Sequence, residues 1–157
     1  MRFSLVEIVL LLAALAIALT ALPRLHGGGG AVVRASWTLT PGVLNPDVTQ
    51  ATIAATICRR GWTRTIRPAV SYTNDLKAKG LRQYRLRGPP SAFQEDHLIS
   101  LELGGDPRDP RNLWPEPYPR AAAVDRIENE LNDLVCRGKL SLADAQRRES
   151  ALKHADG

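Results

Sequence analysis

The fold of this chain is decided by the stretch from Glu95 to Pro115, which reads EDHLISLELGGDPRDPRNLWP. Every second position from Ile99 to Leu103 is apolar, and this period of two predicts that residues 97–103 form a strand with one apolar face. The sequence GGDP at 104–107 is typical of a turn, and residues 111–114 are long enough to form a returning strand. We therefore expect an antiparallel hairpin.

Helical patterns are expected on both sides of this hairpin. Before it, the sequence predicts a helix over residues 45–58, a short extended segment over 62–70 and a short basic helix over 73–81. After it, the apolar residues of 121–136 recur at helical spacing. A last helix is expected over 141–152, where a serine followed by an aspartate three residues later resembles a capping box.

The first 22 residues are typical of an export signal. Arg2 precedes an almost wholly apolar run from Leu5 to Leu22, and Ala16-Ile17-Ala18 has the small residues of a cleavage site. The run is also long enough to span a bilayer as one helix. A cleaved signal peptide and an uncleaved membrane tether through residues 5–22 are both open, and both predict export to the periplasm or the exterior.

A glycine-rich linker and two cysteines indicate the extent of the folded domain. Four glycines at 27–30 favour a flexible linker over residues 23–39, which leaves 40–153 for one small domain. Cys58 and Cys136 lie nearly eighty residues apart, without the spacing of a zinc or redox motif. In an oxidising compartment they could form a disulfide that stabilises the fold by about 4 kcal/mol; two separately buried thiols are the alternative.

The formal net charge is +5, and it stays +5 when the first 22 residues are removed. Such an excess suits a polyanionic partner, either nucleic acid or an anionic membrane surface. Many small soluble proteins are equally basic and bind neither, so charge alone decides nothing.

The hairpin and its surroundings resemble the ββα-metal core of HNH (His-Me finger) endonucleases. The resemblance rests on Asp96-His97 beside a strand, the glycine turn, Asn112-Leu113 on the return, and a following helix. More narrowly, the chain is similar to a group of small exported bacterial HNH-like proteins. They share, in this order, the pieces TPGVLNPDVTQATI, TIC, GWT, RP, VSYTN, EDHLISLELGG, DPRNLWPEP, DRIEN, LVC and SLADAQ. The resemblance implies an α+β fold, mainly helical, around a hairpin-helix core at about 95–136.

Residue chemistry also points to phosphodiester hydrolysis, which needs a base to activate water and a cation to stabilise negative charge. His97 could be the base, because imidazole titrates near neutrality. Asp96 offers a hard oxygen ligand for a divalent ion, whether Mg²⁺, Mn²⁺ or Zn²⁺, with Glu95 in reserve. Asn112 could hydrogen-bond near His97 and fix its orientation. Adjacent strand residues point to opposite faces, so we expect Asp96 at an irregular entry to its strand.

Three arginines near the hairpin, Arg108, Arg111 and Arg120, are candidates for phosphate contacts; the alternative is that they are only solvated. The expected partner is nucleic acid, DNA rather than RNA, and the expected oligomeric state is a monomer.

One ligand position departs from the HNH pattern. HNH enzymes usually place a second metal ligand, His or Asn, at the start of the helix, whereas residues 118–125 read YPRAAAVD. Asp125 or Glu128 could substitute, because residues three apart share a helical face.

Three functions stay open. The first is an exported metal-dependent HNH-type nuclease with His97 as general base. The alternative is a catalytically degenerate exported domain that binds without cutting. A third is a membrane-anchored protein whose basic face contacts anionic lipid.

Overall fold

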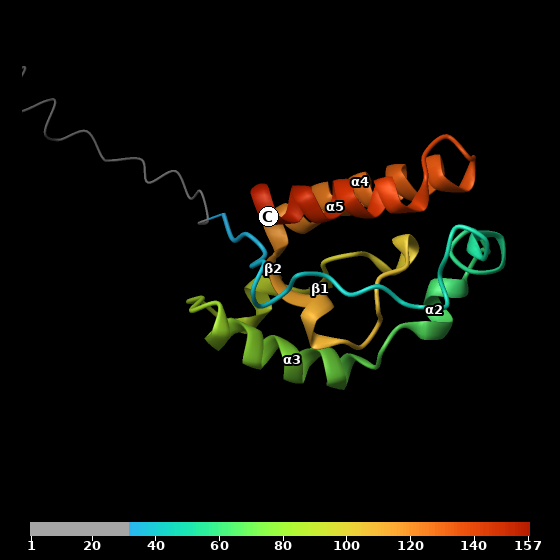
Figure 1. Ribbon diagram of the computed structural model, residues 1–157. Coiled ribbons are helices and arrows are strands. Elements are labelled where there is room, and N and C mark those ends of the chain that lie inside the picture. Colours follow the sequence, from blue (N-terminus) through green and yellow to red (C-terminus); the bar gives the residue numbers. More distant parts are fainter. Residues whose placement is uncertain (1–31) are drawn as a thin grey trace, which may run out of the picture. The chain divides into compact units, whose positions relative to one another are not determined.

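The computed structural model describes residues 32–157 (Figure 1), and the predicted signal or anchor segment at 1–22 lies outside the described residues. Within residues 32–157 the chain forms a small α+β domain of four α-helices and one two-stranded antiparallel sheet. The expected α+β class is confirmed. None of the helices in this part of the chain has the length and apolar content that a membrane span requires.

The sheet is a hairpin of β1 (Phe93–His97) and β2 (Leu113–Pro117). The strand predicted over 97–103 was wrong, because β1 ends at the residue where that strand was expected to begin. Leu101–Leu103 form a single 3-10 turn instead. All four apolar side chains of the segment are buried, so it has no solvent-facing row, and the apparent alternation did not reflect a strand.

Gly104 and Gly105 allow the loop between the strands to fold back on itself. Gly104 has a φ of +78°, which favours glycine, and a Cβ at Gly105 would collide with the carbonyl oxygen of Ile99. The turn predicted at these glycines is therefore present. It lies within a longer connection, residues 98–112, rather than closing a tight hairpin.

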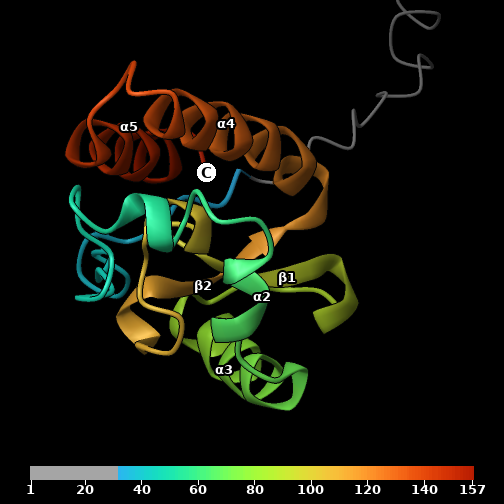
Figure 2. The same cartoon turned by 90° about the vertical axis from the view of Figure 1, so that its right-hand side faces the viewer.

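Helices cover both faces of the hairpin. Helix α3 (Val70–Gln83) lies on one side, and α4 (Tyr118–Cys136) and α5 (Leu142–Ala155) lie together on the other (Figure 1). A view turned by 90° shows the short helix α2 (Trp62–Ile66) in front of the hairpin, between α3 and α4 (Figure 2).

The two C-terminal helices follow their predictions closely. Helix α4 ends at Cys136 as expected, although it begins at Tyr118 rather than Ala121. Helix α5 begins after Ser141, whose Oγ accepts a hydrogen bond from the backbone N–H of Asp144 at 3.1 Å. Local capping and a period of 3.6 residues were enough to define both helices.

Two predictions before the hairpin were wrong. The helix expected over 45–58 is replaced by turns and one 3-10 turn, Ile53–Ala55. Oδ1 of Asn45 accepts a hydrogen bond from the backbone N–H of Asp47 at 3.0 Å; the same residue type caps helices and closes turns, so the pattern was ambiguous. The segment 62–70, expected to be extended, contains α2 and the start of α3.

Cys58 and Cys136 form a disulfide with their Cα atoms 5.5 Å apart, which confirms the expected pairing. Cys58 packs against the main core cluster. Its buried members are Val48, Ile57, Ile99, Leu103, Leu131, Val135, Leu142 and Ala145. Disulfides are typical of proteins that fold in an oxidising compartment.

The domain begins earlier than predicted, because residues 32–39 are not a free linker. The backbone N–H of Ala35 donates to the carbonyl oxygen of Lys153 at 3.0 Å, and Trp37 stacks on His154 with ring centroids 3.5 Å apart. The end of the chain, beyond the predicted limit at residue 153, packs here as well. Val33 also packs against the buried Ala35, Leu98 and Trp114, so the linker boundary at 39 is corrected to a position before residue 33.

Candidate functional site

A polar cleft of about 430 Å³ runs along β1, between α2 and α4. Four consecutive residues of β1 line it, including Asp96 and His97. The lining residues are Thr63, Arg67, Gln94, Glu95, Asp96, His97, Ser100, Leu101, Glu102, Asp125, Glu128 and Asn129.

His97 is the last residue of β1, and its side chain is oriented by a backbone carbonyl. Its Nε2 lies 3.2 Å from the carbonyl oxygen of Pro107. A carbonyl can only accept, so Nε2 carries the proton and Nδ1 of the neutral ring keeps a free lone pair. Burial, which leaves His97 5% exposed, lowers its pKa below the ordinary value. The ring is therefore neutral at pH 7.

Asn112 holds the loop that supplies this carbonyl. It is fully buried; its Oδ1 accepts from the backbone N–H of Ile99 at 2.9 Å, and its Nδ2 donates to the carbonyl oxygens of Ile99 and Asp106 at 3.0 and 2.9 Å. Among residues 32–157 no hydrogen bond joins Asn112 to His97 directly. Asn112 instead fixes the backbone next to Pro107, so its influence on His97 passes through the loop.

Asp96 lies within the regular ladder of β1, opposite Trp114. The irregular entry expected at Asp96 is therefore wrong, and the chain leaves the strand only after His97. Both Asp96 and His97 nevertheless line the one cleft. The side chain of Asp96 is 17% exposed, and its Oδ2 accepts from Nζ of Lys153 at 2.9 Å.

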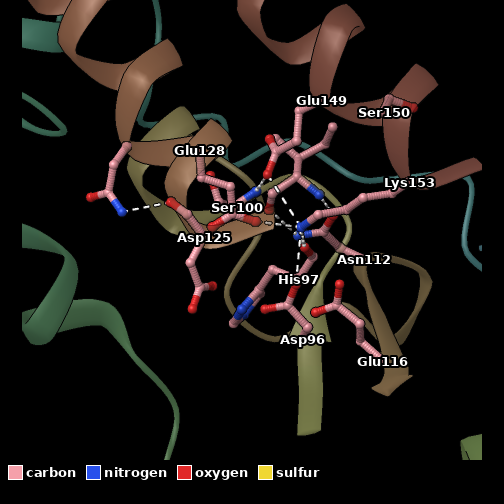
Figure 3. Close-up of polar contacts among 12 residues, drawn as sticks. Asp96, His97, Ser100, Asn112, Glu116, Asp125, Glu128, Glu149, Ser150 and Lys153 are labelled. Atoms are coloured by element: carbon pink, nitrogen blue, oxygen red, sulfur yellow. Dashed lines mark hydrogen bonds and ion pairs between the residues drawn. The ribbon is translucent and has the colours of Figure 1, made fainter. Parts of the chain in front are cut away.

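Lys153, on α5, is the site residue that sequence reasoning missed. Its ammonium is fully buried and donates to Asp96, to the carbonyl oxygen of His97 at 2.5 Å and to Oε1 of Glu128 at 2.5 Å (Figure 3). Glu149 lies 3.3 Å away. Burial alone would lower the pKa of Lys153, but the carboxylates of Asp96, Glu149 and Glu128 more than offset it, so the group stays charged.

The only sequence signal for this cluster was the pair Glu149 and Lys153, four residues apart on a predicted helix. That spacing is far more common on solvated helix faces. The predicted helix also stopped at about Leu152, one residue short. Sequence reasoning therefore had no means of placing this ammonium inside the domain.

Acidic side chains dominate the cleft. Burial raises the pKa of Glu128 to about 9 and that of Glu102 to about 7. Burial, followed by the charge of Asp96, also raises the pKa of Asp125. Figure 3 shows Asp125 and Glu128 on α4 pointing toward the side of β1 that carries Asp96. Both residues proposed as substitutes for the missing helix ligand thus line the cleft.

Glu95, the reserve ligand, is directed away from Asp96. Its Oε2 would lie 4.0 Å from a Cβ added to Gly80 of α3, so the carboxylate faces α3. This oxygen is buried without a hydrogen-bond partner in the described chain, and burial raises the pKa of Glu95 to about 8. Glu95 and Asp96 are therefore not arranged to share one ion.

The carboxylate oxygens beside the cleft are hard donors. Within residues 32–157 no three His, Cys, Asp or Glu side chains lie together as a ligand group for a metal ion. Mg²⁺ keeps several waters and uses one or two carboxylates with substrate phosphate. Asp96, through Oδ1, and Asp125 offer two such carboxylates beside the cleft.

The three arginines predicted to bind phosphate lie elsewhere. Arg111 forms an ion pair with Asp109 at 2.6 Å, and Nε of Arg120 donates to the carbonyl oxygen of Gly157 at 2.6 Å. The guanidinium of Arg108 lies 5.7 Å from the ring centroid of Tyr72. None of the three lines the cleft.

No family model, curated protein or solved structure matches this chain. The resemblance to HNH endonucleases rests on the motif residues and on the order of hairpin and following helix. A hairpin followed by a helix is common and does not by itself indicate a function.

Proposed function

We propose that this protein is an exported, divalent-metal-dependent nuclease of the HNH type, which hydrolyses phosphodiester bonds with His97 as general base. The observation that carries the proposal is the arrangement of the His97 ring. One nitrogen is committed to the carbonyl oxygen of Pro107, and the other is free beside a cleft lined by carboxylates.

The state of His97 supports its role as the base. A neutral imidazole with a fixed tautomer can take a proton from water at Nδ1. The resulting hydroxide forms a bond to phosphorus as the bond from phosphorus to the leaving oxygen breaks, and the leaving oxygen then takes a proton from solvent water. Positioned general bases contribute about 10²- to 10⁴-fold to rates. Asn112 holds the loop through the carbonyl oxygens of Ile99 and Asp106. It thereby keeps the Pro107 carbonyl in place while the base gains and loses its proton.

The carboxylates support a cation beside this base. Asp96 and Asp125 would hold a Mg²⁺ or Mn²⁺ ion, which would supply stabilisation of the negative charge that develops on the phosphate. Lys153 holds one oxygen of Asp96 at 2.9 Å and so fixes the direction of the other. Burial raises the pKa values of Glu102 and Glu128, which line the same cleft, and a divalent ion there would favour their charged forms.

Export, substrate and oligomeric state complete the proposal. Export is supported by the apolar first 22 residues and by the Cys58–Cys136 disulfide. We keep DNA as the expected substrate and a monomer as the active form. N-terminal sequencing of the protein isolated from cells decides between cleavage and a membrane tether, since an anchored lipid-binding protein would retain residues 1–22.

The decisive experiment is nicking of supercoiled plasmid by the full chain with Mg²⁺ or Mn²⁺. We expect activity that EDTA abolishes and that His97→Ala lowers by about 10²- to 10⁴-fold. Asn129→Ala, which changes a cleft residue without a proposed chemical role, is the matched control and should retain activity. Nicking that survives in His97→Ala would sink the mechanism.

A specific observation favours the second candidate, a catalytically degenerate binding domain. The ammonium of Lys153 already neutralises Asp96, the carboxylate on which a metal would depend most. Calorimetry with Mg²⁺ and Mn²⁺ separates the two functions. Stoichiometric binding that Asp96→Ala removes contradicts the degenerate domain, and no binding even with a phosphodiester present contradicts the nuclease.

A further inference from the structure

Four arginines lie within nine residues around α2. They are Arg59, Arg60, Arg64 and Arg67, here called the α2 arginine segment. All four are exposed, and none forms an ion pair within the described residues 32–157. No acidic residue occurs between Asp47 and Asp75. The segment is therefore a concentration of positive charge without ion-pair partners. Arg111 differs, because it forms an ion pair with the neighbouring Asp109.

The α2 arginine segment reaches the cleft through Arg67. Thr63 of α2 and Arg67, which follows the last residue of α2, both line the cleft, and α2 stands in front of the hairpin in Figure 2. Burial has the largest effect on both neighbouring pKa values, lowering that of His97 and raising that of Asp125. The positive charge of Arg67 lowers both pKa values by a smaller amount. Arg67 is thus close enough to influence the proposed reaction centre.

The segment is also held in place. The disulfide at Cys58 ties its start to the end of α4, and the buried Pro68 follows its end. The guanidinium of Arg64 folds over Gly61, where an added Cβ would lie 3.3 Å from Nη2. When a partner binds, ordering a mobile surface costs binding free energy. A segment that is already fixed has a smaller cost of this kind.

The acidic cleft cannot by itself attract a polyanion. DNA carries one negative charge per about 1.7 Å of duplex, and the acidic side chains that line the cleft outnumber its one arginine. Positive charge beside the cleft is needed to attract the phosphates, and the α2 arginine segment supplies it, with Arg67 at the cleft itself.

We propose that the α2 arginine segment is the surface on which the phosphate backbone of nucleic acid docks, with Arg67 holding the phosphate nearest the cleft. The inference rests on the proposed function and assigns the contacts that Arg108, Arg111 and Arg120 were expected to make. Because phosphates carry no sequence information, docking through this segment is sequence-independent.

The test is DNA binding by the full chain carrying His97→Ala, in EDTA, so that neither cleavage nor metal contributes. A short fluorescently labelled duplex is titrated by anisotropy between about 50 and 200 mM salt. We expect Arg64→Ala/Arg67→Ala to weaken binding at low salt by at least about tenfold and to reduce the slope of log K against log salt by about 2.

The matched control is Arg82→Ala/Arg87→Ala, which removes the same charge from exposed positions at the far end of α3. It should change affinity by no more than about twofold. Both double variants should keep the parent's urea midpoint, because all four side chains are exposed. Equal weakening by the two variants, unchanged binding by the α2 variant, or no binding by the parent overturns the proposal.

The outcomes separate this inference from the proposed function. Binding through the α2 arginine segment, with no nicking by the unmutated protein under any divalent ion, would remove the nuclease and leave the docking surface. Full nicking by Arg64→Ala/Arg67→Ala would remove the docking surface and leave the nuclease.

Discussion

Glu116 on β2 is fully buried, and only one of its carboxylate oxygens has a hydrogen-bond partner in the described chain. Its Oε2 accepts from Nε2 of Gln94 at 2.9 Å, and Oε1 has none. Burial first, and then the charge of Asp96, raise the pKa of Glu116 to about 8. An unfolded glutamate titrates near 4.3, so the folded protein binds this proton more tightly.

A pH dependence of stability follows. Because the folded protein holds the extra proton, the free energy of unfolding falls as pH rises from about 4.5 through 8. Glu116→Gln should remove part of this fall, about 1–3 kcal/mol between pH 5 and 8, in urea unfolding. Glu130→Gln, an exposed position on α4, is the control and should leave the pH profile unchanged. An identical profile for Glu116→Gln and the unmutated protein would contradict the assignment.

At the scale of elements, α5 is joined to the hairpin through charge as well as apolar packing. Lys153 contacts Asp96 of β1 and Glu128 of α4, while Oε1 of Glu149 accepts from the backbone N–H of Ser100 at 2.9 Å. One ammonium thus links three elements around the proposed site.

Lys153→Met tests this linkage. The substitution leaves Asp96, Glu128 and Glu149 buried without their cation, so we expect the free energy of unfolding at pH 7 to fall by about 3–5 kcal/mol in urea denaturation. Glu149→Gln/Lys153→Met should recover part of this loss, because it removes one of the carboxyl groups that the ammonium served, and the exposed Lys139→Met should lose little. A double variant that is no more stable than Lys153→Met would mean that packing rather than charge dominates.

At the scale of the whole molecule, the Cys58–Cys136 disulfide closes a loop of 78 residues that contains the hairpin and the whole of α4. In the chain-entropy model a loop of this length stabilises the fold by about 4 kcal/mol. Cys58→Ser/Cys136→Ser should therefore lower the free energy of unfolding by up to about 4 kcal/mol in urea denaturation. Reduction of the unmutated protein should give the same midpoint as the double variant. A midpoint that neither treatment moves would show that the disulfide adds nothing to stability.

Several features of the molecule follow from local chemistry and could be predicted from the sequence. The helical spacing of 121–136 and the cap at Ser141 define α4 and α5, because capping and side-chain period act within a few residues. The two cysteines had only each other as partner. The region of the candidate site could be located from Asp96, His97 and the glycine turn. The strand, however, precedes and includes His97 instead of beginning there.

The arrangement within the site was decided only by tertiary structure. Lys153 is stable in the interior because carboxylates from β1, α4 and α5 converge on it, and no local pattern encodes that convergence. The apolar residues of 98–103 are buried on all sides by segments distant in sequence, which overrode their strand-like period. Likewise, Arg67 borders the cleft only because α2 packs beside the hairpin. The order of residues defines which reactive groups this protein carries, because local chemistry acts within a few residues, whereas packing between distant segments defines which of those groups meet.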